Sequence, residues 1–388
     1  MKKRNAEKST HKNDDSLLLN QNSITIEKKY LIQRLIAISK VQDLNTLKKK
    51  ITTLKGTISG SKKNPSKLFR KKENGSTIVL RKDVLLSELN QIIDSQTIER
   101  AKYYIERLEN GIQNIKTGKI NDINLLRWKE YDDILTDSLW IIKERDSSGA
   151  HLGWYWGNFI PQIPHQLMAR YTKQGEWVLD PFAGSGTTLI ECRRCGRNGI
   201  GIELNPKTAQ KAKASIEKEQ NKYGIISEII VGDSRTIDCK DVLKKFGTLS
   251  VQLLILHPPY HDIIKFSDDR KDLSNTKDTE HFLTMFGNVI DNVAPSLDNE
   301  RFCALVIGDK YSDGEWIPLG FYCMNEVMKR GFILKSIIVK NFDSTRAKRN
   351  QQELWRYRAL AGGFYIFKHE YIMLFQKVKG HTRRDKIL

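Results

Sequence analysis

The spacing of apolar residues divides the chain into two parts with different hydrophobic patterns. Over residues 24–54 and again over residues 84–117, apolar side chains recur every three or four positions, as in amphipathic helices. Between them, residues 56–76 are rich in Gly, Pro and Asn and indicate a loop, and TIVLRK from residue 77 indicates a short strand. The N-terminal part is therefore predicted to be mainly helical.

Beyond about residue 130, short aliphatic runs alternate with helical stretches. The predicted strands are WVLDPF, NGIGIEL, IISEIIVGD, LLILHPP, RFCALVIGD, ILKSIIVKNF and HEYIMLFQK. Helices are expected to end at Cys195 and near Tyr223, and to span residues 279–294 and 318–330. This alternation predicts an α/β fold with a doubly wound, parallel, Rossmann-like sheet, which binds ligands at the carboxyl ends of its strands.

These patterns predict four segments of the chain. Residues 1–23 are polar and are expected to form a disordered basic tail. Residues 24–130 are expected to form a mainly helical basic domain, residues 131–379 the α/β domain, and residues 380–388 a C-terminal tail.

Charge is concentrated near the N-terminus. The 388 residues carry a formal net charge of +19, and residues 1–82 contain 21 Lys or Arg against six Asp or Glu. Clustered cations favour a polyanionic partner, so we expect this region to bind nucleic acid, the alternative being a solvated basic tail. The sequence shows no apolar run long enough for a membrane span and no secretion signal, so we expect a cytoplasmic protein without membrane contact.

The five cysteines give little sign of metal or redox chemistry. Cys192 and Cys195 form a single CxxC pair inside a predicted helix, without a second pair or flanking histidines. We expect them to serve packing rather than a functional thiol pair, and we expect no metal site.

The stretch LDPFAGSGTTLIE, residues 179–191, combines a buried strand, a glycine turn and a helix start. Its spacing is neither that of a phosphate-binding GxxxxGK[ST] loop nor that of GxGxxG. The next predicted strand ends in Glu203, where a carboxylate suits a ribose diol, and the following strand is closed by Asp233. The pattern indicates a nucleotide-cofactor loop, although a glycine loop that merely turns a strand into a helix would share it.

DPFAGSGTT followed by GIGIELNP resembles the S-adenosylmethionine loop of amino-group DNA methyltransferases. The segment GNFIPQIPHQLMARYTKQGEW, residues 157–177, is similar to the helical segment that packs over the methionine moiety in that family. The resemblance implies that Glu203 binds the ribose hydroxyls and Asp233 the adenine amino group. It also implies that the methionine end of the cofactor is lined by Asp180, Pro181, Phe182, Ala183, Gly184 and Gly186.

In the same family a later strand ends in [D/N/S]PP[Y/F/W], which HPPY, residues 257–260, resembles. An exocyclic amino group is conjugated with its ring and is therefore a poor nucleophile. Acceptors that bond both of its N–H groups draw the nitrogen lone pair out of this conjugation, so that it can attack the sulfonium methyl group. The resemblance implies that His257, Pro258, Pro259 and Tyr260 form this catalytic turn. Pro258 offers a carbonyl without a competing N–H, and Tyr260 can stack on an extruded base.

His257 departs from the family pattern, which has Asp, Asn or Ser there. A neutral imidazole offers one acceptor nitrogen, and its free pKa of about 6.5 would let it take up the released proton. The alternative is that His257 only orients the base. In the enzymes that the turn resembles, Ser usually accompanies cytosine N4, and Asp or Asn accompanies adenine N6. Because the turn is not acidic, cytosine N4 is favoured over adenine N6.

Residues 341–367 combine basic and aromatic side chains between the last two predicted strands. Such a combination can grip phosphates and stack on bases, so we expect DNA contacts there, against the alternative of an ordinary exposed helix. The expected contact residues are Arg346, Lys348, Arg349, Arg356 and Arg358.

The expected protein is thus an S-adenosylmethionine-dependent DNA methyltransferase of the restriction-modification type, acting alone or beside a restriction endonuclease. Its motif order, cofactor loop before catalytic turn, differs from the arrangement in which DPFxGSGTT follows PPY. Two alternatives stay open, an RNA base methyltransferase and a DNA-binding protein whose catalytic site is degenerate.

If His257 accepts a hydrogen bond or a proton, the methyl-transfer step should slow as the pH falls below about 6.5, where the imidazolium can no longer accept. Single-turnover rates between pH 5.5 and 8 would measure this, and a flat profile would remove that role.

Overall fold

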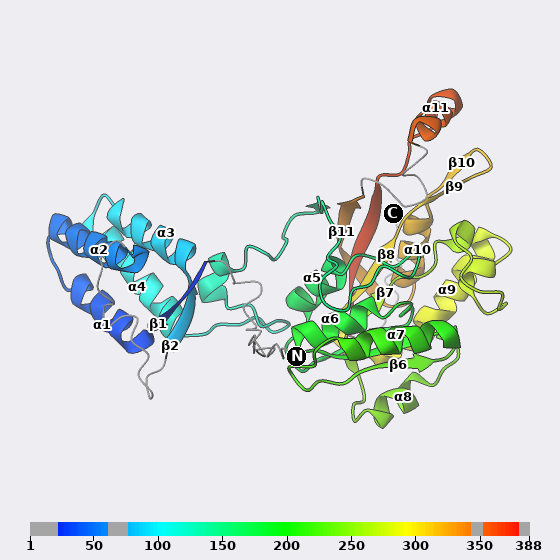
Figure 1. Ribbon diagram of the computed structural model, residues 1–388, viewed down its shortest axis with the longest axis horizontal. Coiled ribbons are helices and arrows are strands. Elements are labelled where there is room, and N and C mark those ends of the chain that lie inside the picture. Colours follow the sequence, from blue (N-terminus) through cyan, green and yellow to red (C-terminus); the bar gives the residue numbers. More distant parts are fainter. Residues whose placement is uncertain (1–21, 61–76, 343–351, 380–388) are drawn as a thin grey trace, which may run out of the picture. The chain divides into compact units, whose positions relative to one another are not determined.

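The computed structural model describes residues 22–60, 77–342 and 352–379 and divides the chain into two units (Figure 1). One unit comprises Met1–Gly118 and Ile123–Asp133, and the other Lys119–Asp122 and Ile134–Leu388. Residues 1–21 of the expected N-terminal tail, residues 61–76 of the expected loop and the expected C-terminal tail lie outside the described residues. Within the described ranges, no helix is long and apolar enough to cross a membrane.

The first unit is a small helical domain with a two-stranded antiparallel ribbon. Asp43 accepts a hydrogen bond from the Thr46 amide at the start of α2, and Thr97 accepts one from the Arg100 amide at the start of α4, so two helices have side-chain N-caps. Apolar residues from the four helices and from both strands share one buried core. The elements are β1 (Ser23–Glu27), α1 (Lys28–Ser39), α2 (Leu44–Ser59), β2 (Thr77–Arg81), α3 (Lys82–Ile93), α4 (Ile98–Gln113) and the 3-10 helix η2 (Leu125–Glu130).

One prediction for this unit was partly wrong. Residues 24–54 were expected to form amphipathic helices, but residues 23–27 form a strand and the first helix begins only at Lys28. Ile24 pairs with Leu80 and Ile26 with Ile78 across the ribbon, so backbone partners some fifty residues away decide the strand. The TIVLRK strand is confirmed.

The second unit is built on an eight-stranded sheet in the order β3-β11-β12-β8-β7-β4-β5-β6. The strands from β8 to β6 are parallel to one another, whereas β12 runs antiparallel to both of its neighbours. The strands are β3 (Leu139–Trp140), β4 (Trp177–Asp180), β5 (Asn198–Glu203), β6 (Ser227–Val231), β7 (Val251–Leu256), β8 (Leu297–Ile307), β11 (Phe332–Asn341) and β12 (His369–Lys377).

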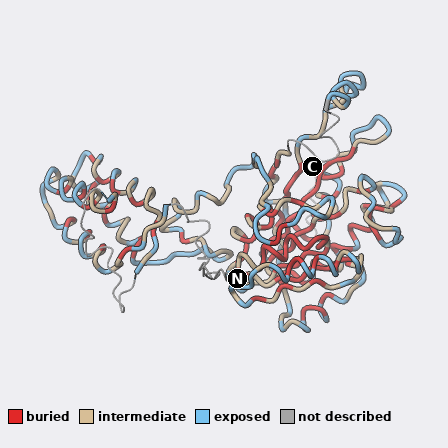
Figure 2. The backbone as a smooth tube through the Cα atoms, viewed as in Figure 1, coloured by how far each residue is buried: buried red, intermediate tan, exposed pale blue. Residues whose placement is uncertain are grey.

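Helices connect the strands and cover both faces of this sheet. In β7, Leu254 and Leu256 belong to one buried core, which includes side chains of α8, α9 and α10, while Leu253 and Ile255 belong to another, which includes side chains of α5. Buried residues therefore line the centre of the sheet (Figure 2). The helices are α5 (Gln162–Tyr171), α6 (Thr187–Cys195), α7 (Pro206–Lys218), α8 (Cys239–Lys245), α9 (Thr279–Val293), α10 (Leu319–Met328) and α11 (Gln352–Gly362).

The structure confirms the predicted Rossmann-like α/β class and the seven predicted strands of this unit. It adds elements that the pattern did not reveal, namely β3, α8, the hairpin strands β9 (Lys310–Ser312) and β10 (Glu315–Ile317), and the 3-10 helices η3 (His261–Ile263), η4 (Leu273–Asn275) and η5 (Ala294–Ser296). The two antiparallel pairings of β12 also differ from a wholly parallel sheet. None of these missed helices and strands is longer than seven residues, which is too short for periodicity to show.

Glycine in β5 lets α6 approach the sheet closely. A Cβ atom on Gly199 would lie 2.6 Å from Cys192 Sγ and 2.9 Å from Leu189 Cδ2. Gly199→Ala should therefore lower the free energy of unfolding by about 1–3 kcal/mol. In a Cys192→Ala background the same change should lower the free energy of unfolding by less, because the Sγ atom nearest to the new Cβ is absent. Urea denaturation of the four proteins measures both costs, and equal costs in the two backgrounds would refute the contact.

Candidate functional site

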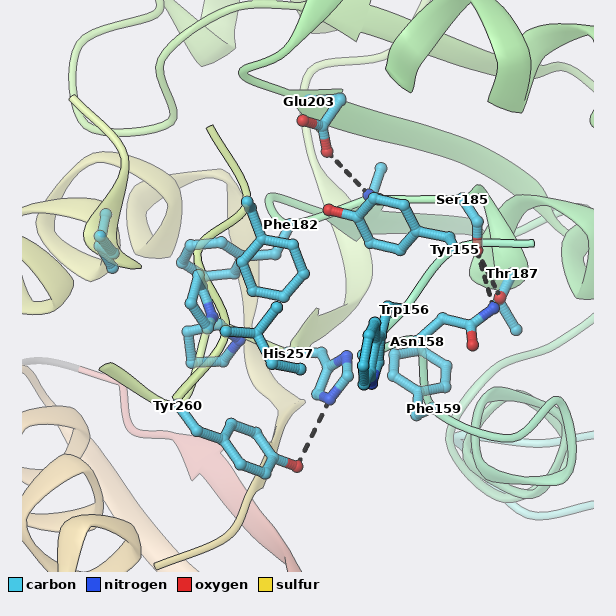
Figure 3. Close-up of a pocket in the computed structure, with 18 of the residues that line it drawn as sticks. Tyr155, Trp156, Asn158, Phe159, Phe182, Ser185, Thr187, Glu203, His257 and Tyr260 are labelled. Atoms are coloured by element: carbon cyan, nitrogen blue, oxygen red, sulfur yellow. Dashed lines mark hydrogen bonds between the residues drawn. The ribbon is translucent and has the colours of Figure 1, made fainter. Parts of the chain in front are cut away.

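The site lies where the strand order of the sheet reverses. From β4 the chain proceeds through β5 to β6 on one side, and from β7 it proceeds to β8 on the other side, so the loops after β4 and β7 are neighbours. Ligands of doubly wound folds bind at such a point. A cavity lies here and is lined by both loops (Figure 3). Its volume of about 630 Å³ is suited to a small-molecule ligand.

Asp180 ends β4 and is 1% exposed. Its Oδ1 accepts a hydrogen bond from the Phe182 amide at 2.9 Å, and its Oδ2 accepts one from the Thr188 hydroxyl at 2.5 Å. Burial raises the pKa of Asp180 to about 6, and the two hydrogen bonds oppose the rise. The Asp180 carboxylate thus connects the glycine loop to α6. It does not line the cavity, whereas the resemblance implied that it does.

Gly186 also lies behind the cavity wall. It has a φ of +79° at the N-cap of α6, and a Cβ atom there would lie 2.9 Å from Ile216 Cδ1 of α7. Its role is to begin the helix and to let α6 and α7 pack. Pro181, Phe182, Ala183 and Gly184, in contrast, do line the cavity, and their contact with the methionine end of a cofactor stays a prediction.

Glu203 ends β5 and faces the glycine loop (Figure 3). Its Oε2 accepts a hydrogen bond from the Gly184 amide at 2.9 Å, and its Oε1 accepts one from the Asn205 amide at 2.8 Å. Burial raises the pKa of Glu203 although both amides lower it. Because a carboxylate has about four acceptor positions, two of them stay available to hydroxyl groups of a ligand.

Asp233 follows β6 and lines the same cavity. Its Oδ1 accepts hydrogen bonds from the Arg235 amide at 2.9 Å and from Arg235 Nε at 3.0 Å, and its Oδ2 accepts one from Arg235 Nη2 at 2.7 Å. Burial would raise the pKa of Asp233, but Arg235 outweighs it and holds this pKa below its usual value. The ionised Asp233 carboxylate can accept a hydrogen bond from an amino group of a ligand in the cavity. Its contact with the adenine amino group of the cofactor stays a prediction.

Aromatic residues before α5 cover the glycine loop. The Tyr155 ring stacks on Phe266 with 5.6 Å between centroids and an angle of 22°, and a Cβ atom on Gly184 would lie 3.0 Å from Tyr155 Cε1. Asn158 Nδ2 donates to Ser185 Oγ at 3.0 Å. Tyr155 and Trp156 lie just before residues 157–177, the segment that the resemblance indicated, and only the run of aromatic residues WYW in the sequence could have revealed them.

The turn after β7 forms the opposite wall. His257, Pro258, Pro259 and Tyr260 all line the cavity, so the glycine loop and the HPPY turn share one space (Figure 3). The His257 ring packs edge-on against Phe159 at 4.6 Å between centroids.

Two charged residues behind the turn escaped the sequence analysis. Tyr260 donates its hydroxyl hydrogen to Glu370 Oε2 at 2.9 Å, and Lys340 Nζ donates to Glu370 Oε1 at 2.9 Å. Tyr260 Oη also lies 3.4 Å from His257 Nε2. Lys340 of β11 and Glu370 of β12 are direct cross-strand partners, and sequence positions 30 apart in different strands carry no local signal of such pairing.

The pKa of His257 changes the expected pH dependence. The ring faces the cavity but is withdrawn from bulk water, and this burial lowers its pKa to about 4, with Glu370 raising and Lys340 lowering it. The expected slowing below pH 6.5 is therefore wrong for this histidine, which stays neutral down to about pH 5. A flat rate profile between pH 5.5 and 8 is compatible with an acceptor role. So weak a base is poorly suited to take up a proton.

The expected DNA-contacting residues fall in two groups. Arg356 and Arg358 lie on α11 with exposed side chains, and the Arg358 guanidinium lies 5.3 Å from the centre of the Trp355 ring. Arg346, Lys348 and Arg349 lie outside the described residues.

An ion-pair network fastens residues 146–158 to α6. Glu191 is 2% exposed and accepts hydrogen bonds from His151 Nε2 at 2.6 Å, His165 Nδ1 at 2.9 Å and Arg194 Nη1 at 3.2 Å. Arg194 Nη1 also bonds Asp146 Oδ2 at 3.0 Å. Because residues 146–158 include Tyr155 and Trp156, this network positions the aromatic cover of the cavity.

Side chains of the same network have spacings that could suit a metal. Among the described residues two such groups occur, His165 with Glu191 and Cys195, and Asp146 with His151 and Glu191. Both groups need Glu191, whose oxygens already accept three hydrogen bonds, one of them from a guanidinium. We therefore interpret these residues as an ion-pair network.

Comparisons with known proteins show which proteins this chain is similar to. A family model described as DNA methylase matches residues 12–214, more than half of the chain, a stretch that includes the glycine loop and Glu203 and ends before His257. Type II methyltransferase M.MjaII of Methanocaldococcus jannaschii is 36% identical over 93 residues, which are 24% of this chain and 17% of that protein. Type II methyltransferase M.HpaI of Haemophilus parainfluenzae is 40% identical over 71 residues, 17% of this chain and 23% of that protein.

Further similarities are more distant. Type II methyltransferase M.Cfr9I of Citrobacter freundii is 33% identical over 82 residues, 21% of this chain and 26% of that protein. The chain thus spans about a quarter or less of the length of these relatives. Among solved structures, TrmN from Thermus thermophilus is similar with a TM-score of 0.38 and 14% identity over 57% of this chain and 50% of that one.

Glu191→Gln should lower the free energy of unfolding by about 3 kcal/mol, because it removes a buried charge from its cationic partners. Burial raises the pKa of Glu191, but His151 and His165 outweigh it and hold this pKa at about 2, below the ordinary 4.5. The carboxylate therefore stabilises the fold above pH 4.5, and the deficit of the variant should shrink as the pH falls from 4.5 towards 2.

Asp241→Asn is the matched control, since it breaks the exposed ion pair with Lys245 and should leave stability nearly unchanged. Urea denaturation as a function of pH measures both variants. A deficit for Glu191→Gln that is no larger than that of the control would contradict the role of the network.

Proposed function

Because this chain belongs to the DNA methylase family, we propose that it is a site-specific, S-adenosylmethionine-dependent DNA methyltransferase. It methylates an exocyclic amino group of an extruded base, cytosine N4 in preference to adenine N6. One observation carries the proposal: the glycine loop after β4 and the HPPY turn after β7 line one cavity. A methyl donor held by the first motif would lie beside the acceptor groups of the second.

The cavity walls suit the cofactor. S-adenosylmethionine supplies an electrophilic methyl group on a sulfonium. The two remaining acceptor positions of Glu203 receive the ribose hydroxyls, and the ionised Asp233 receives the adenine amino group. Phe182, Gly184 and the Tyr155 ring above them enclose the methionine end.

The HPPY turn prepares the amino group. The Pro258 carbonyl and a neutral His257 nitrogen accept its two N–H hydrogens, which draws the nitrogen lone pair out of conjugation with the base. Neither proline has an N–H to compete, and Tyr260 is anchored by Glu370 so that its ring keeps one orientation beside the base. Holding nucleophile and methyl group in line contributes several kcal/mol to lowering the barrier.

Cytosine N4 is favoured by the chemistry of the first turn residue. The enzymes that His257 and its neighbours resemble have Ser there for cytosine and Asp or Asn for adenine, and a neutral imidazole is not acidic. Both bases offer two N–H donors, so the acceptor geometry serves either one.

DNA is held by the basic parts of the chain. Arg356 and Arg358 of α11 contact phosphates, and the basic N-terminal residues bind the duplex electrostatically. The enzyme acts in the cytoplasm as the modification enzyme of a restriction system, alone or beside an endonuclease.

The reaction is tested by incubating the protein with labelled S-adenosylmethionine and unmodified genomic DNA, followed by digestion and mass analysis of the nucleosides. We expect N4-methylcytosine; N6-methyladenine would move the target to adenine. Transfer to RNA alone would make the protein an RNA base methyltransferase. Cofactor binding without transfer to either nucleic acid would leave a DNA-binding protein with a degenerate site.

Glu203→Gln should weaken S-adenosylmethionine binding about 10-fold or more, because a charged acceptor of the ribose is lost. Calorimetric titration measures the affinity. Glu228→Gln is the control, since Glu228 of β6 forms an exposed pair with Lys213 and does not line the cavity. Equal affinities of the two variants would count against the assigned ribose contact.

Arg356→Ala combined with Arg358→Ala should weaken DNA binding. The slope of log K against log salt should become shallower by roughly 2, about 0.9 for each lost phosphate contact. Lys244→Ala with Lys245→Ala removes the same charge from α8 as a control. Fluorescence anisotropy at several salt concentrations measures the slopes, and an unchanged slope in the α11 variant would rule out these phosphate contacts.

A further inference from the structure

We propose that Lys340, Glu370 and Tyr260 act as positioning residues that hold the single ring proton of His257 on Nε2, so that Nδ1 presents its lone pair to the amino group being methylated. This inference rests on the proposed function, since it assigns the acceptor of that reaction. None of the three residues needs to touch the methyl donor to act in this way.

The assignment follows from counting hydrogens along the chain of contacts. Lys340 Nζ can only donate, and it lies 2.9 Å from Glu370 Oε1. The Glu370 carboxylate, paired with Lys340, can only accept, so the Tyr260 hydroxyl donates its one hydrogen to Glu370 Oε2 at 2.9 Å. Tyr260 Oη then has only lone pairs to offer to His257 Nε2, 3.4 Å away. Nε2 must therefore carry the hydrogen.

The other ring nitrogen is left as an acceptor at the cavity. A neutral imidazole has one hydrogen, so a hydrogen on Nε2 leaves Nδ1 bare. No described residue bonds His257 Nδ1, and in Figure 3 this nitrogen points away from Tyr260. Because His257 lines the cavity, the lone pair is available to a ligand.

A histidine in this turn needs such support. The oxygen of Asn, Asp or Ser always has a lone pair, whereas the wrong tautomer of His257 would turn an N–H towards an amino group that also presents N–H. The contacts that exclude it are costly, since Lys340 is 4% and Glu370 9% exposed, and burying two charges costs solvation free energy. They are built into the sheet as a direct β11–β12 pair, which keeps the geometry fixed.

Glu370→Gln should invert the proton arrangement. Lys340 will hold the amide oxygen, which turns the amide NH₂ towards Tyr260 and makes Tyr260 an acceptor there. The Tyr260 hydroxyl then donates to His257 Nε2, and the ring hydrogen moves to Nδ1. We expect single-turnover methylation to slow by about 100-fold, comparable to the loss of a preorganised catalytic hydrogen bond.

A second variant separates this account from plain structural damage. Tyr260→Phe keeps the ring and removes the tautomer bias without enforcing the wrong tautomer, so we expect a loss of roughly 10-fold. The double variant Glu370→Gln/Tyr260→Phe has no Tyr260 hydroxyl that could donate to His257 Nε2, so the wrong tautomer is no longer enforced. Its methylation rate should therefore rise above that of Glu370→Gln and approach that of Tyr260→Phe. A double variant as slow as Glu370→Gln, or slower, would overturn the proposal.

The control is Glu326→Gln, the same change in an ion pair of α10 with Lys329 and Arg330, which should leave the rate unchanged. The tautomer is read directly from ¹⁵N shifts of labelled histidine, with the His257 signal identified by its disappearance in His257→Asn. The wild type should show the Nε2–H tautomer and Glu370→Gln the Nδ1–H tautomer; an Nδ1–H tautomer in the wild type would refute the inference.

The ring measurement needs neither DNA nor turnover. If the wild-type protein methylates no nucleic acid but shows the Nε2–H tautomer, the proposed function fails and the proton assignment stands. If it methylates DNA and shows the Nδ1–H tautomer, the function stands and the inference fails.

Discussion

The parallel pairing of β4 with β7 is the constraint on which the site depends. Val178 pairs with Leu253 and Leu179 with Leu254, so both strands end at the same edge of the sheet. Because the chain crosses to opposite sides from these two strands, no other strand separates the loops that follow them. A glycine loop and a proline turn more than seventy residues apart are thereby brought to one cavity.

The polar groups at this edge are held in different ways according to their exposure. Asp180, behind the wall, is 1% exposed and does not line the cavity, and its carboxylate accepts one hydrogen bond from the glycine loop and one from α6, so its charge serves the shape of the loop. Glu203, at the wall, gives part of its acceptor capacity to backbone amides and keeps the rest for a ligand. The same distinction separates Gly186, which lets helices pack, from Gly184, over which Tyr155 lies.

Much of this could be predicted from residues close together in sequence. The strand–glycine–helix pattern around Gly184, the carboxylate that ends the next strand and the Pro-Pro-aromatic turn are local features, and each indicates its own place in a doubly wound fold. The β1 strand, Lys340 and Glu370 could not be found in this way. Each depends on a backbone partner in another part of the chain, and hydrophobic periodicity carries no information about such partners.

The sequence by itself determined the fold class and the two motifs, because alternation of strands and helices and the stereochemistry of Gly and Pro act over a few residues. Only the tertiary structure decided the chemistry of His257. Its pKa is lowered because folding removes the ring from bulk water, and its proton position follows from a tyrosine three residues away and a charged pair on two distant strands. Electrostatics and hydrogen bonding at a site are sums over neighbours in space, and those neighbours exist only once the sheet is assembled.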